Sequence, residues 1–532
     1  MDQKIVFDQY NNSVKTKVLG NSSNLTNSTK SYKNSEELLE AVGGYGRYQL
    51  MIHLIAMVAL SGEVLQAMSV VFTGLPSPLN ITTDSKNLSV EHPCDVVSTQ
   101  RHYLQPTRFS FVVEFDLSCE RAWLAQMVTS AFFAGAMIGN LVFGWTSDNY
   151  GRRKTLLYIY VIFLLVGCCT SLSTNVWQLI ALRFLSGVFT APVQQLMASI
   201  LSEMVSPGLR SQVVVTSYLL WPVALSMLSL IAYFIPNWKL INLIVTAPYL
   251  LFLPILVLLP EPLEWLIIKG RIQDARRLLQ KISHWNKRPL ASNVDIQSPK
   301  QVLCNRKISF LNLFYTKELA MTTIIMGVSF FSITISFYGL LMSSGDLSKG
   351  SSVYKNFFYS TIVELPAYLV TCYVLGRFGR KRTNLLGMVV GCIACFLLSS
   401  IPDDDDAWSS VRLSIGVFGR CFITITFMSI VPWTIELYPT TIRSQAVGFG
   451  LSMGRFSTIL SPWIMSQIKQ FHSAAPWGFL ATLLLWASVL MMLLPETKTK
   501  LPLTDISDDI IRDHLNDNDY RCIEYIEVVS SV

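Results

Sequence analysis

The chain has 532 residues, of which 51% are apolar and only 14% are charged. An ordinary soluble domain has about 25% charged residues, so this composition excludes that class and indicates a membrane protein. The formal net charge is +7, and we attribute it to loops on one side of a membrane and not to a nucleic-acid-binding surface.

Long apolar runs recur along the chain after a polar segment, 1–49. A helix needs about 20 consecutive apolar residues to cross a bilayer. The first run therefore reads as a retained span, since a cleaved signal peptide would be shorter and closer to the start. Twelve runs are predicted to be transmembrane helices, at 50–74, 123–145, 155–174, 177–199, 212–235, 238–259, 318–342, 354–375, 384–401, 410–434, 444–467 and 475–495.

Lys and Arg in short loops mark the cytoplasmic side. Basic clusters follow the second run, at 152–154, and the eighth, at 377–382, and eleven Lys or Arg lie within 260–317. With twelve spans all three segments share one side. We therefore predict that this side and both termini are cytoplasmic, in a multi-pass protein of the plasma membrane.

The loop 75–122 is predicted to lie outside. It contains glycosylation sequons at Asn80 and Asn87, on the side of the membrane where glycosylation takes place. Cys94 and Cys119 lie in the same loop and could form a disulfide there.

The sequence repeats itself with a period of about 230 residues. Parallel repeats of this kind place a substrate site near the membrane midplane, between two homologous halves. The predicted domains are thus a six-helix half at 50–259, a central cytoplasmic loop at 260–317, a second six-helix half at 318–495 and a tail at 496–532. The matching landmarks are "YGRRK" (150–154) with "FGRKR" (378–382), Arg183 with Arg420, "EMVSPGLRS" (203–211) with "ELYPTTIRS" (436–444), and "LLPEP" (258–262) with "LLPET" (493–497).

Further motifs carry a family resemblance. They include "AVGGYGRYQ" (41–49), "EFDLSCERAW" (114–123), "GWTSDNYGRRK" (144–154), "LPEPLEWLIIKGRIQDA" (259–275), "VELPAYLV" (363–370), "ELYPTTIR" (436–443) and "LPETK" (494–498). With these motifs the chain resembles the major facilitator superfamily and, within it, the organic cation, anion and carnitine transporter family, over about residues 35 to 500. The resemblance implies an all-α fold of twelve helices in two pseudo-symmetric halves and transport of small organic ions.

Charges at the predicted inner helix ends are expected to pair across the halves and with helix termini, in gating and structural roles. By resemblance, Arg183 has a similar structural role. The superfamily pattern of adjacent Asp and Arg is broken in both copies, as Asp148-Asn149 and Gly376-Arg377. The inner-end charges are Asp148, Arg152, Arg153, Glu203, Arg210, Arg380, Glu436 and Arg443.

Four charges lie in the middle of apolar runs and are the candidates for substrate contact, namely Glu63, Glu364, Arg420 and Arg455. A charge in a membrane helix costs roughly 2.5–3.5 kcal/mol and usually faces a bundle interior or a wet cavity. Arg455 shares one helix face with Gly448 and Ser452. By resemblance, Arg455 stands where the family's cation transporters have an aspartate and its anion and carnitine transporters have an arginine, and Glu364 matches a pocket glutamate of the cation transporters.

One charge of each sign suits a zwitterion such as carnitine or a betaine. Arg455 would hold the carboxylate, and Glu364 the ammonium, together with the rings of Phe331 and Tyr338. The alternative is that Glu364 and Arg455 pair with each other. Three roles are open for Glu63: it binds a coupling cation, faces the outer vestibule or pairs with Arg420.

The expected function is transport of small organic zwitterions or cations by a monomer that contacts membrane lipid. Organic-anion exchange and a non-transporting sensor or scaffold are the alternatives. No catalytic pair, metal-ligand spacing or phosphate-binding loop is present, so neither an enzyme nor a cofactor or metal site is expected.

Overall fold

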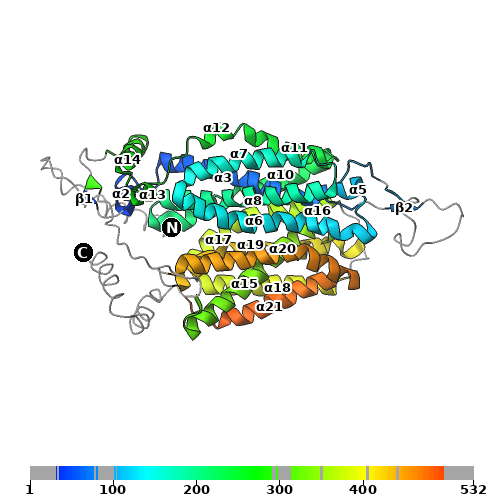
Figure 1. Cartoon of the computed structure of the whole chain (residues 1–532). Coiled ribbons are helices and arrows are strands. Elements are labelled where there is room, and N and C mark those ends of the chain that lie inside the picture. Colours follow the sequence, from blue (N-terminus) through cyan, green and yellow to red (C-terminus); the bar gives the residue numbers. More distant parts are fainter. Residues whose placement is uncertain are drawn as a thin grey trace.

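The computed structural model describes residues 31–32, 35–76, 79–81, 101–103, 105–289, 295–296, 313–347, 352–402, 406–438 and 442–496. Within these ranges the chain forms a bundle of long helices (Figure 1). One end of the bundle carries α14 and the other carries α5, and we call them the α14 end and the α5 end (Figure 1).

The first half of the bundle is built from the segments before residue 260. Its short connecting elements lie at the two ends or break the longer helices. The helices are α2 (Ser35–Ala41), α3 (Arg47–Met68), α4 (Val70–Thr73), α5 (Phe111–Glu114), η3 (Cys119–Arg121), α6 (Ala122–Tyr150), α7 (Arg152–Thr170), α8 (Val176–Met204), η4 (Pro207–Leu209), α9 (Arg210–Thr216), α10 (Leu220–Phe234), α11 (Trp238–Thr246), η5 (Ala247–Leu250) and α12 (Leu253–Leu256).

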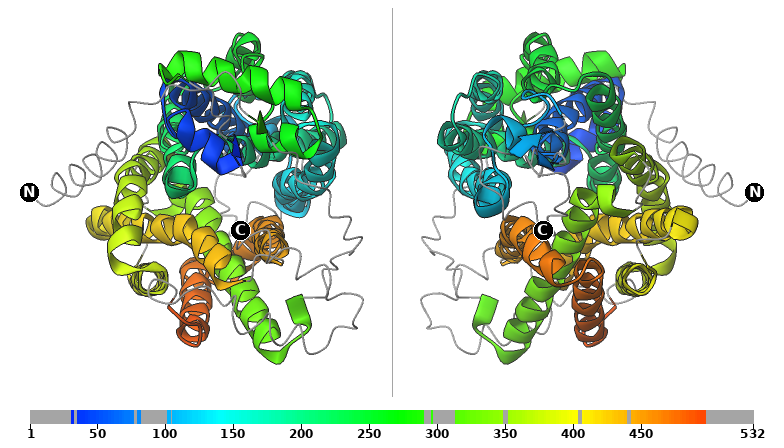
Figure 2. Two further views of the ribbon diagram at one scale, coloured as in Figure 1. Left: turned by 90° about the vertical axis from the view of Figure 1, so that its left-hand side faces the viewer. Right: turned by 90° about the vertical axis from the view of Figure 1, so that its right-hand side faces the viewer.

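Two helices of the central loop follow, and then the second half. The loop helices are α13 (Leu263–Ile268) and α14 (Ile272–Asn286). The second half consists of α15 (Lys317–Met342), η7 (Ser344–Leu347), α16 (Val353–Ile362), α17 (Glu364–Phe378), α18 (Arg380–Ser400), α19 (Asp406–Leu437), α20 (Arg443–Phe471) and α21 (Ala475–Met492). Figure 2 shows the two halves from the ends of the bundle, as two separate groups of helices.

Strands are short and lie outside the helical bundle. β1 (Ser31–Tyr32) pairs in parallel with β4 (Asp295–Ile296). β2 (Leu79–Ile81) pairs antiparallel with β3 (Arg101–Tyr103). Both pairs are peripheral to the helices that could cross a membrane.

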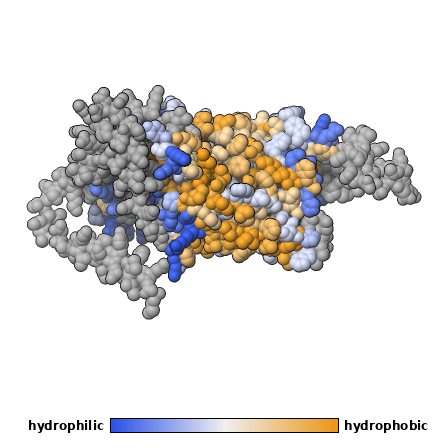
Figure 3. Space-filling view, turned by 90° about the horizontal axis from the view of Figure 1, so that it is seen from below, coloured by the Kyte–Doolittle hydropathy of each residue, from blue (hydrophilic) through white to orange (hydrophobic). Residues whose placement is uncertain are grey.

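Ten helical segments of the described residues are long and apolar enough to cross a membrane. The other two predicted spans are the sixth and the eleventh. The sixth is broken into α11, η5 and α12, and prolines lie in the first turns of both η5 and α12. The eleventh is the continuous helix α20, which carries Arg455. An apolar surface band separates hydrophilic ends, as expected of a protein surrounded by lipid (Figure 3).

The repeated landmarks have a common structural role at the α14 end. Gly151 and Gly379 have φ angles of 113° and 91° and precede α7 and α18. The Glu261 carboxylate accepts hydrogen bonds from the backbone N–H groups of Arg153 and Lys154, at 3.1 and 3.3 Å. A carboxylate at this position satisfies unpaired donors at the start of a helix.

The second half contains the same cap. The carboxylate of Glu496 accepts from the backbone N–H groups of Arg380, Lys381 and Arg382. An added Cβ at Gly379 would come within 2.9 Å of that carboxylate, so the glycine leaves room for the cap. The repeated "LLPE" thus supplies an N-terminal cap to a helix that begins more than 100 residues earlier.

The halves contact each other through polar groups toward the α5 end. Ser130 of α6 donates to the Ile459 carbonyl of α20 at 2.7 Å and accepts from the indole of Trp463 at 2.8 Å. On the other side of the bundle, the hydroxyls of Ser226 (α10) and Thr361 (α16) are 3.0 Å apart. The interface between the halves is therefore tightly packed near the α5 end.

Candidate functional site

The mid-span charges Glu364 and Arg420 form an ion pair within the second half. Both side chains are buried, at 0% and 1% exposed. Arg420 also donates to the carbonyls of Ser360 and Phe337, at 3.1 and 3.2 Å, and lies over the Phe337 ring. The suggested Glu364–Arg455 and Glu63–Arg420 pairs are thus wrong, because Glu364 and Arg420 neutralise each other.

Arg183 occupies the equivalent place in the first half. Its guanidinium donates to the Gln66 carbonyl at 3.0 Å, contacts the Ser69 hydroxyl at 3.4 Å and lies 5.5 Å from the Phe132 ring centroid. Each half therefore contains a buried arginine that ties neighbouring helices together through carbonyls and an aromatic face.

Arg455 lies on the face of α20 that is turned toward the first half. Its guanidinium donates to the side-chain oxygen of Gln194, in α8, at 2.8 Å. The side chain is partly exposed, as is Ser452, and Gly448 is exposed with no atom near its would-be Cβ. This stripe of α20 thus becomes more exposed toward the α14 end.

Glu63 of α3 is the second charge at the interface between the halves. It is 4% exposed, and one carboxylate oxygen, Oε2, has no hydrogen-bond partner among the described residues. The guanidinium of Arg455 acts electrostatically on this carboxylate. A carboxylate of the first half and a guanidinium of the second thus interact across the interface.

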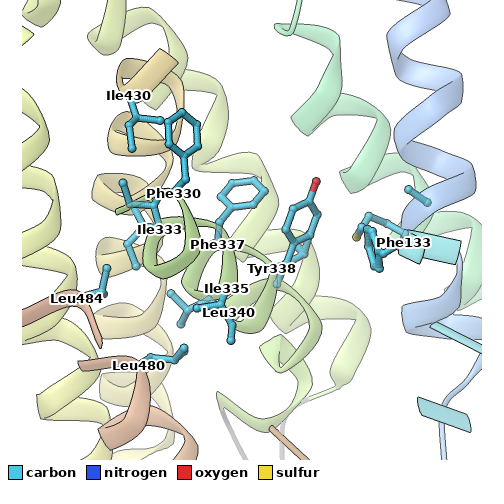
Figure 4. Close-up of a cluster of buried hydrophobic side chains, with 14 of the residues drawn as sticks. Phe133, Phe330, Ile333, Ile335, Phe337, Tyr338, Leu340, Ile430, Leu480 and Leu484 are labelled. Carbon is cyan, nitrogen blue, oxygen red and sulfur yellow. The ribbon is translucent and has the colours of Figure 1, made fainter. Parts of the chain in front are cut away.

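Aromatic hydroxyls complete this group. Tyr338 of α15 interacts with Arg455 and Glu63, and Tyr218, between α9 and α10, with Gln194. The ring of Tyr338 is 5.5 Å from that of Phe133 in α6, on the side of α15 that faces the first half (Figure 4). We call Glu63, Gln194, Tyr218, Tyr338 and Arg455 the interface cluster.

Phe331 packs against α20 at a different place from Tyr338. Its ring packs 6.5 Å from that of Phe456 in α20. It lies seven residues before Tyr338, which places it about two turns nearer the α14 end of α15. The structure thus separates the two predicted aromatic residues along the same helix.

Sequence analysis did not identify two members of the interface cluster. Gln194 lies eleven residues after Arg183, so both share one face of α8, and this spacing is a signal that could have identified it. Tyr218 belongs to the fifth apolar run, in which nothing distinguishes its ring from packing residues. Its position at a break between two helices is visible only in the structure.

The charges at the α14 end pair within each half. Arg152 bonds Asp148 at 2.9 Å and Glu203 at 2.6 Å, and Arg380 bonds Glu436 at 2.8 Å. The expectation of ion pairs across the halves is thus wrong for Arg152 and Arg380, because each of them is paired with an acid of its own half.

Two of the remaining inner-end charges contact backbone carbonyls, and the side chain of the third is outside the described part of the structure. Arg153 donates to the Val257 carbonyl at 2.6 Å, and Arg210 to the Val205 carbonyl at 3.3 Å. Arg443 begins α20, and its side chain is outside the described part of the structure.

The predicted external loop is described only in part. Asn80 lies in β2, opposite His102 of β3, and Cys119 is disulfide-bonded. Asn87 and Cys94 lie outside the described residues, so the sequons and the Cys94–Cys119 pairing remain predictions.

Comparison with known proteins identifies the family. The family model described as "Sugar (and other) transporter" matches residues 55–508. Solute carrier family 22 member 2 of Rattus norvegicus is 30% identical over 393 residues, covering 74% of this chain and 70% of the relative. Organic cation/carnitine transporter 4 of Arabidopsis thaliana is 27% identical over 480 residues, covering 88% and 89%. Human solute carrier family 22 member 13 is 30% identical over 425 residues, covering 79% and 75%.

Solved structures agree on the fold. An inward open conformation of the xylose transporter XylE from E. coli aligns with a TM-score of 0.60 and 17% identity, covering 85% of this chain and 98% of that chain. XylE bound to a bromo-deoxyglucose aligns equally well, with a TM-score of 0.60. These structures confirm the predicted twelve-helix fold, and the family model and the curated relatives confirm the family resemblance. The chain is therefore a multi-pass membrane transporter, and not an enzyme, that belongs to solute carrier family 22 of the major facilitator superfamily.

Proposed function

We propose that this transporter carries small organic zwitterions and cations, of carnitine or betaine type, by alternating access. The observation that carries the proposal is the interface cluster, in which a buried carboxylate and a guanidinium from different halves act on each other. Among the relatives, the Arabidopsis protein is named an organic cation/carnitine transporter, which supports this class of substrate.

Arg455 is the proposed site for a substrate carboxylate. Its planar guanidinium can hold a carboxylate through two parallel hydrogen bonds. Its bond to the neutral amide of Gln194 leaves the charge of the guanidinium uncompensated by that partner. An arriving carboxylate can therefore replace a weaker, neutral contact.

Glu63 is the proposed site for the positive end of the substrate. This replaces our expectation for Glu364, whose charge is already neutralised by Arg420. The Glu63 oxygen that has no partner in the described part of the chain can attract an ammonium, and the rings of Tyr218 and Tyr338 offer faces for cation–π contacts. A quaternary amine, which cannot donate a hydrogen bond, suits such a mixed site.

The proposal links binding to transport because the two charges belong to different halves. A zwitterion that contacts Arg455 in α20 and Glu63 in α3 interacts with both halves at once. Rocking of one half against the other can then expose the same substrate to either side. A substrate that satisfies both charges also removes the cost of leaving one of them buried and unpaired.

Uptake of three labelled compounds tests the site: carnitine, a quaternary amine and an aromatic carboxylate. In Glu63→Gln, uptake of carnitine and of the amine is expected to fall at least about tenfold, since a hydrogen bond or contact to a charged group is worth about 1.5–3 kcal/mol. Uptake of the carboxylate should persist. In Arg455→Ala, carnitine and the carboxylate should be lost and the amine retained.

Lys469→Gln is the matched control, because it removes a cation from the exposed α5 end of the same helix. All three uptakes should stay at the wild-type level in this variant. Cell-surface biotinylation separates lost transport from lost expression. Equal loss of all three compounds in Glu63→Gln and Arg455→Ala, with normal surface levels, would contradict the proposed roles.

Organic-anion exchange is the alternative, and one observation favours it. Arg455 is partly exposed, whereas Glu63 is buried. A substrate anion therefore reaches Arg455 more easily than a substrate cation reaches Glu63. In that case Glu63→Gln would leave uptake of the carboxylate intact and the amine would not be transported by the wild type.

The proposed setting is the plasma membrane, with the α14 end in the cytoplasm and a monomeric chain. The excess of Lys and Arg in the loops at this end supports the orientation. Asn80 and Asn87 are then external and glycosylated. A glycosidase-sensitive mass that disappears in the Asn80→Gln/Asn87→Gln variant checks this assignment.

A further inference from the structure

Helix α14 is held rigidly against the first half. The side chain of Asn286, at its last residue, accepts from the backbone N–H of Tyr48 at 3.1 Å and donates to the Val42 carbonyl at 3.0 Å. Its apolar face is buried in the core of the first half, through Ala275, Leu278, Leu279 and Ile282. The position of this helix relative to α3 is therefore well defined.

The exposed part of the central-loop helices is strongly basic. Residues 264–288 contain seven Lys or Arg and two acids, Glu264 and Asp274. Asp274 is already paired with Arg271 at 2.7 Å and with Arg277 at 3.3 Å. Lys281, on a later turn of the same helix, is exposed.

One flank of α14 meets the start of α3. The ring of Trp285 is 5.6 Å from that of Tyr48 in a T-shaped contact, and the ammonium of Lys281 is 5.7 Å from the same ring centroid. Arg47, the neighbour of Tyr48 in the chain, is exposed. We call Arg47, Lys281 and Trp285 the α3–α14 corner.

The corner lies where the lipid-facing surface of α3 begins. Leu50 and Leu54 are 45% and 53% exposed and lie on the same helix face as Arg47, three and seven residues further along. On the face of the molecule drawn in Figure 3, an apolar band gives way to hydrophilic residues at its edges. Trp285 is itself 43% exposed and packs against Tyr48 at the start of this apolar helix, where aromatic residues commonly anchor membrane proteins.

We propose that the α3–α14 corner binds the headgroup of an anionic phospholipid. Two exposed cations attract the phosphate, and the indole of Trp285 packs at the boundary between headgroups and acyl chains. Each Lys or Arg near an anionic membrane surface contributes about 1 kcal/mol. Since α14 is docked on the first half, a bound lipid holds that half at the bilayer surface while the second half moves.

A titration of the full chain in neutral detergent tests this site, with short-chain phosphatidylinositol bisphosphate as the probe. The thermal unfolding midpoint of the wild type should rise to a plateau as lipid is added. In Arg47→Gln/Lys281→Gln the lipid concentration at half-effect should increase about thirtyfold, from about fivefold for each cation. Short-chain phosphatidylcholine should produce no shift in either protein.

Arg276→Gln is the matched control. Arg276 lies nine residues before Trp285, which is half a turn around the helix, so it points to the opposite flank and should keep the wild-type affinity. An unchanged affinity in the double variant, or an equal loss in Arg276→Gln, would overturn the proposal. Equally tight binding of soluble inositol trisphosphate would overturn the assignment to a lipid. The unfolding midpoint without lipid shows whether each variant is folded.

Discussion

At the scale of single residues, four charges in apolar helices divide into two kinds. Glu364 and Arg420 neutralise each other inside the second half, whereas Glu63 and Arg455 lie on different halves and interact at a distance. Local sequence marks all four as unusual, because any charge in an apolar run is costly. It does not say which acid meets which arginine, since that depends on how α3, α17, α19 and α20 pack.

The Glu364–Arg420 pair is expected to be needed for folding. Replacing one member of a buried pair leaves an uncompensated charge and costs about 3–5 kcal/mol. We expect Glu364→Ala to reduce the monodisperse peak in fluorescence-detected size exclusion and to abolish uptake of every substrate. Glu364→Ala/Arg420→Met, which removes both charges, should recover the peak.

Glu63→Gln is the comparison for this prediction. It removes a carboxylate that has an unpartnered oxygen, so the folded fraction should stay near that of the wild type. A Glu364→Ala protein that folds normally and loses only cation uptake would show that Glu364 contacts substrate instead.

At the scale of elements, helix starts depend on residues distant in sequence. The carboxylate of Glu261 caps α7, and an added Cβ at Gly151 would lie 2.5 Å from it. The repeat of "LLPE" and of the glycine before each basic cluster is readable in the sequence. The contact between these landmarks cannot be read from the sequence, because more than 100 residues separate them.

Gly151→Ala should destabilise the first half. The glycine has a φ of 113° and a ψ of 145°, a region that costs other residues about 1–3 kcal/mol, and its Cβ would displace the cap. A lower midpoint of thermal unfolding in detergent is the expected result.

Gly208→Ala is the control, since a Cβ at Gly208 meets nothing within 4 Å. Its midpoint should equal that of the wild type. If Gly151→Ala unfolded at the wild-type temperature, the cap would not be a significant source of stability.

At the scale of the whole molecule, the halves are joined by polar and aromatic contacts toward the α5 end. Phe72 of α4 stacks on Tyr354 of α16, with 5.5 Å between the ring centroids, and Ser229 of α10 donates to the Tyr354 carbonyl at 2.6 Å. Transport by alternating access requires these contacts to break and re-form.

A crosslink at this interface should therefore stop transport. The hydroxyls of Ser226 and Thr361 are 3.0 Å apart, so Ser226→Cys/Thr361→Cys places two thiols close together on different halves. Oxidation is expected to reduce uptake to background, and a reducing agent to restore it.

Ser429→Cys/Asn384→Cys is the matched pair within one half, where the hydroxyl and the amide oxygen are 2.9 Å apart. Its oxidation should leave uptake unchanged. Persistent uptake after confirmed formation of the 226–361 disulfide would show that the α5 end does not need to open.

Composition and pattern account for the spans, the family and the repeat, because these follow from local hydropathy and short motifs. The twelve apolar runs correspond to helices, although the sixth is broken at its prolines and the fifth and eighth are each divided between two helices. Arg455 is turned toward the other half, and its contact with substrate stays a prediction. Glu364 pairs with Arg420, and the sequence did not single out Gln194 or Tyr218.

What the sequence could not supply was the pairing of its charges. Apolar helices are held in place by shape and by many weak contacts, so their rotation and depth determine whether a carboxylate meets Arg420, Arg455 or neither. Only the packed bundle brings Glu63 and Arg455 to opposite sides of one interface, keeps Arg152 and Arg380 with acids of their own halves, and packs α14 against the first half. The reason is physical: these are contacts between segments tens to hundreds of residues apart, and their energies depend on distances that exist only in the folded chain.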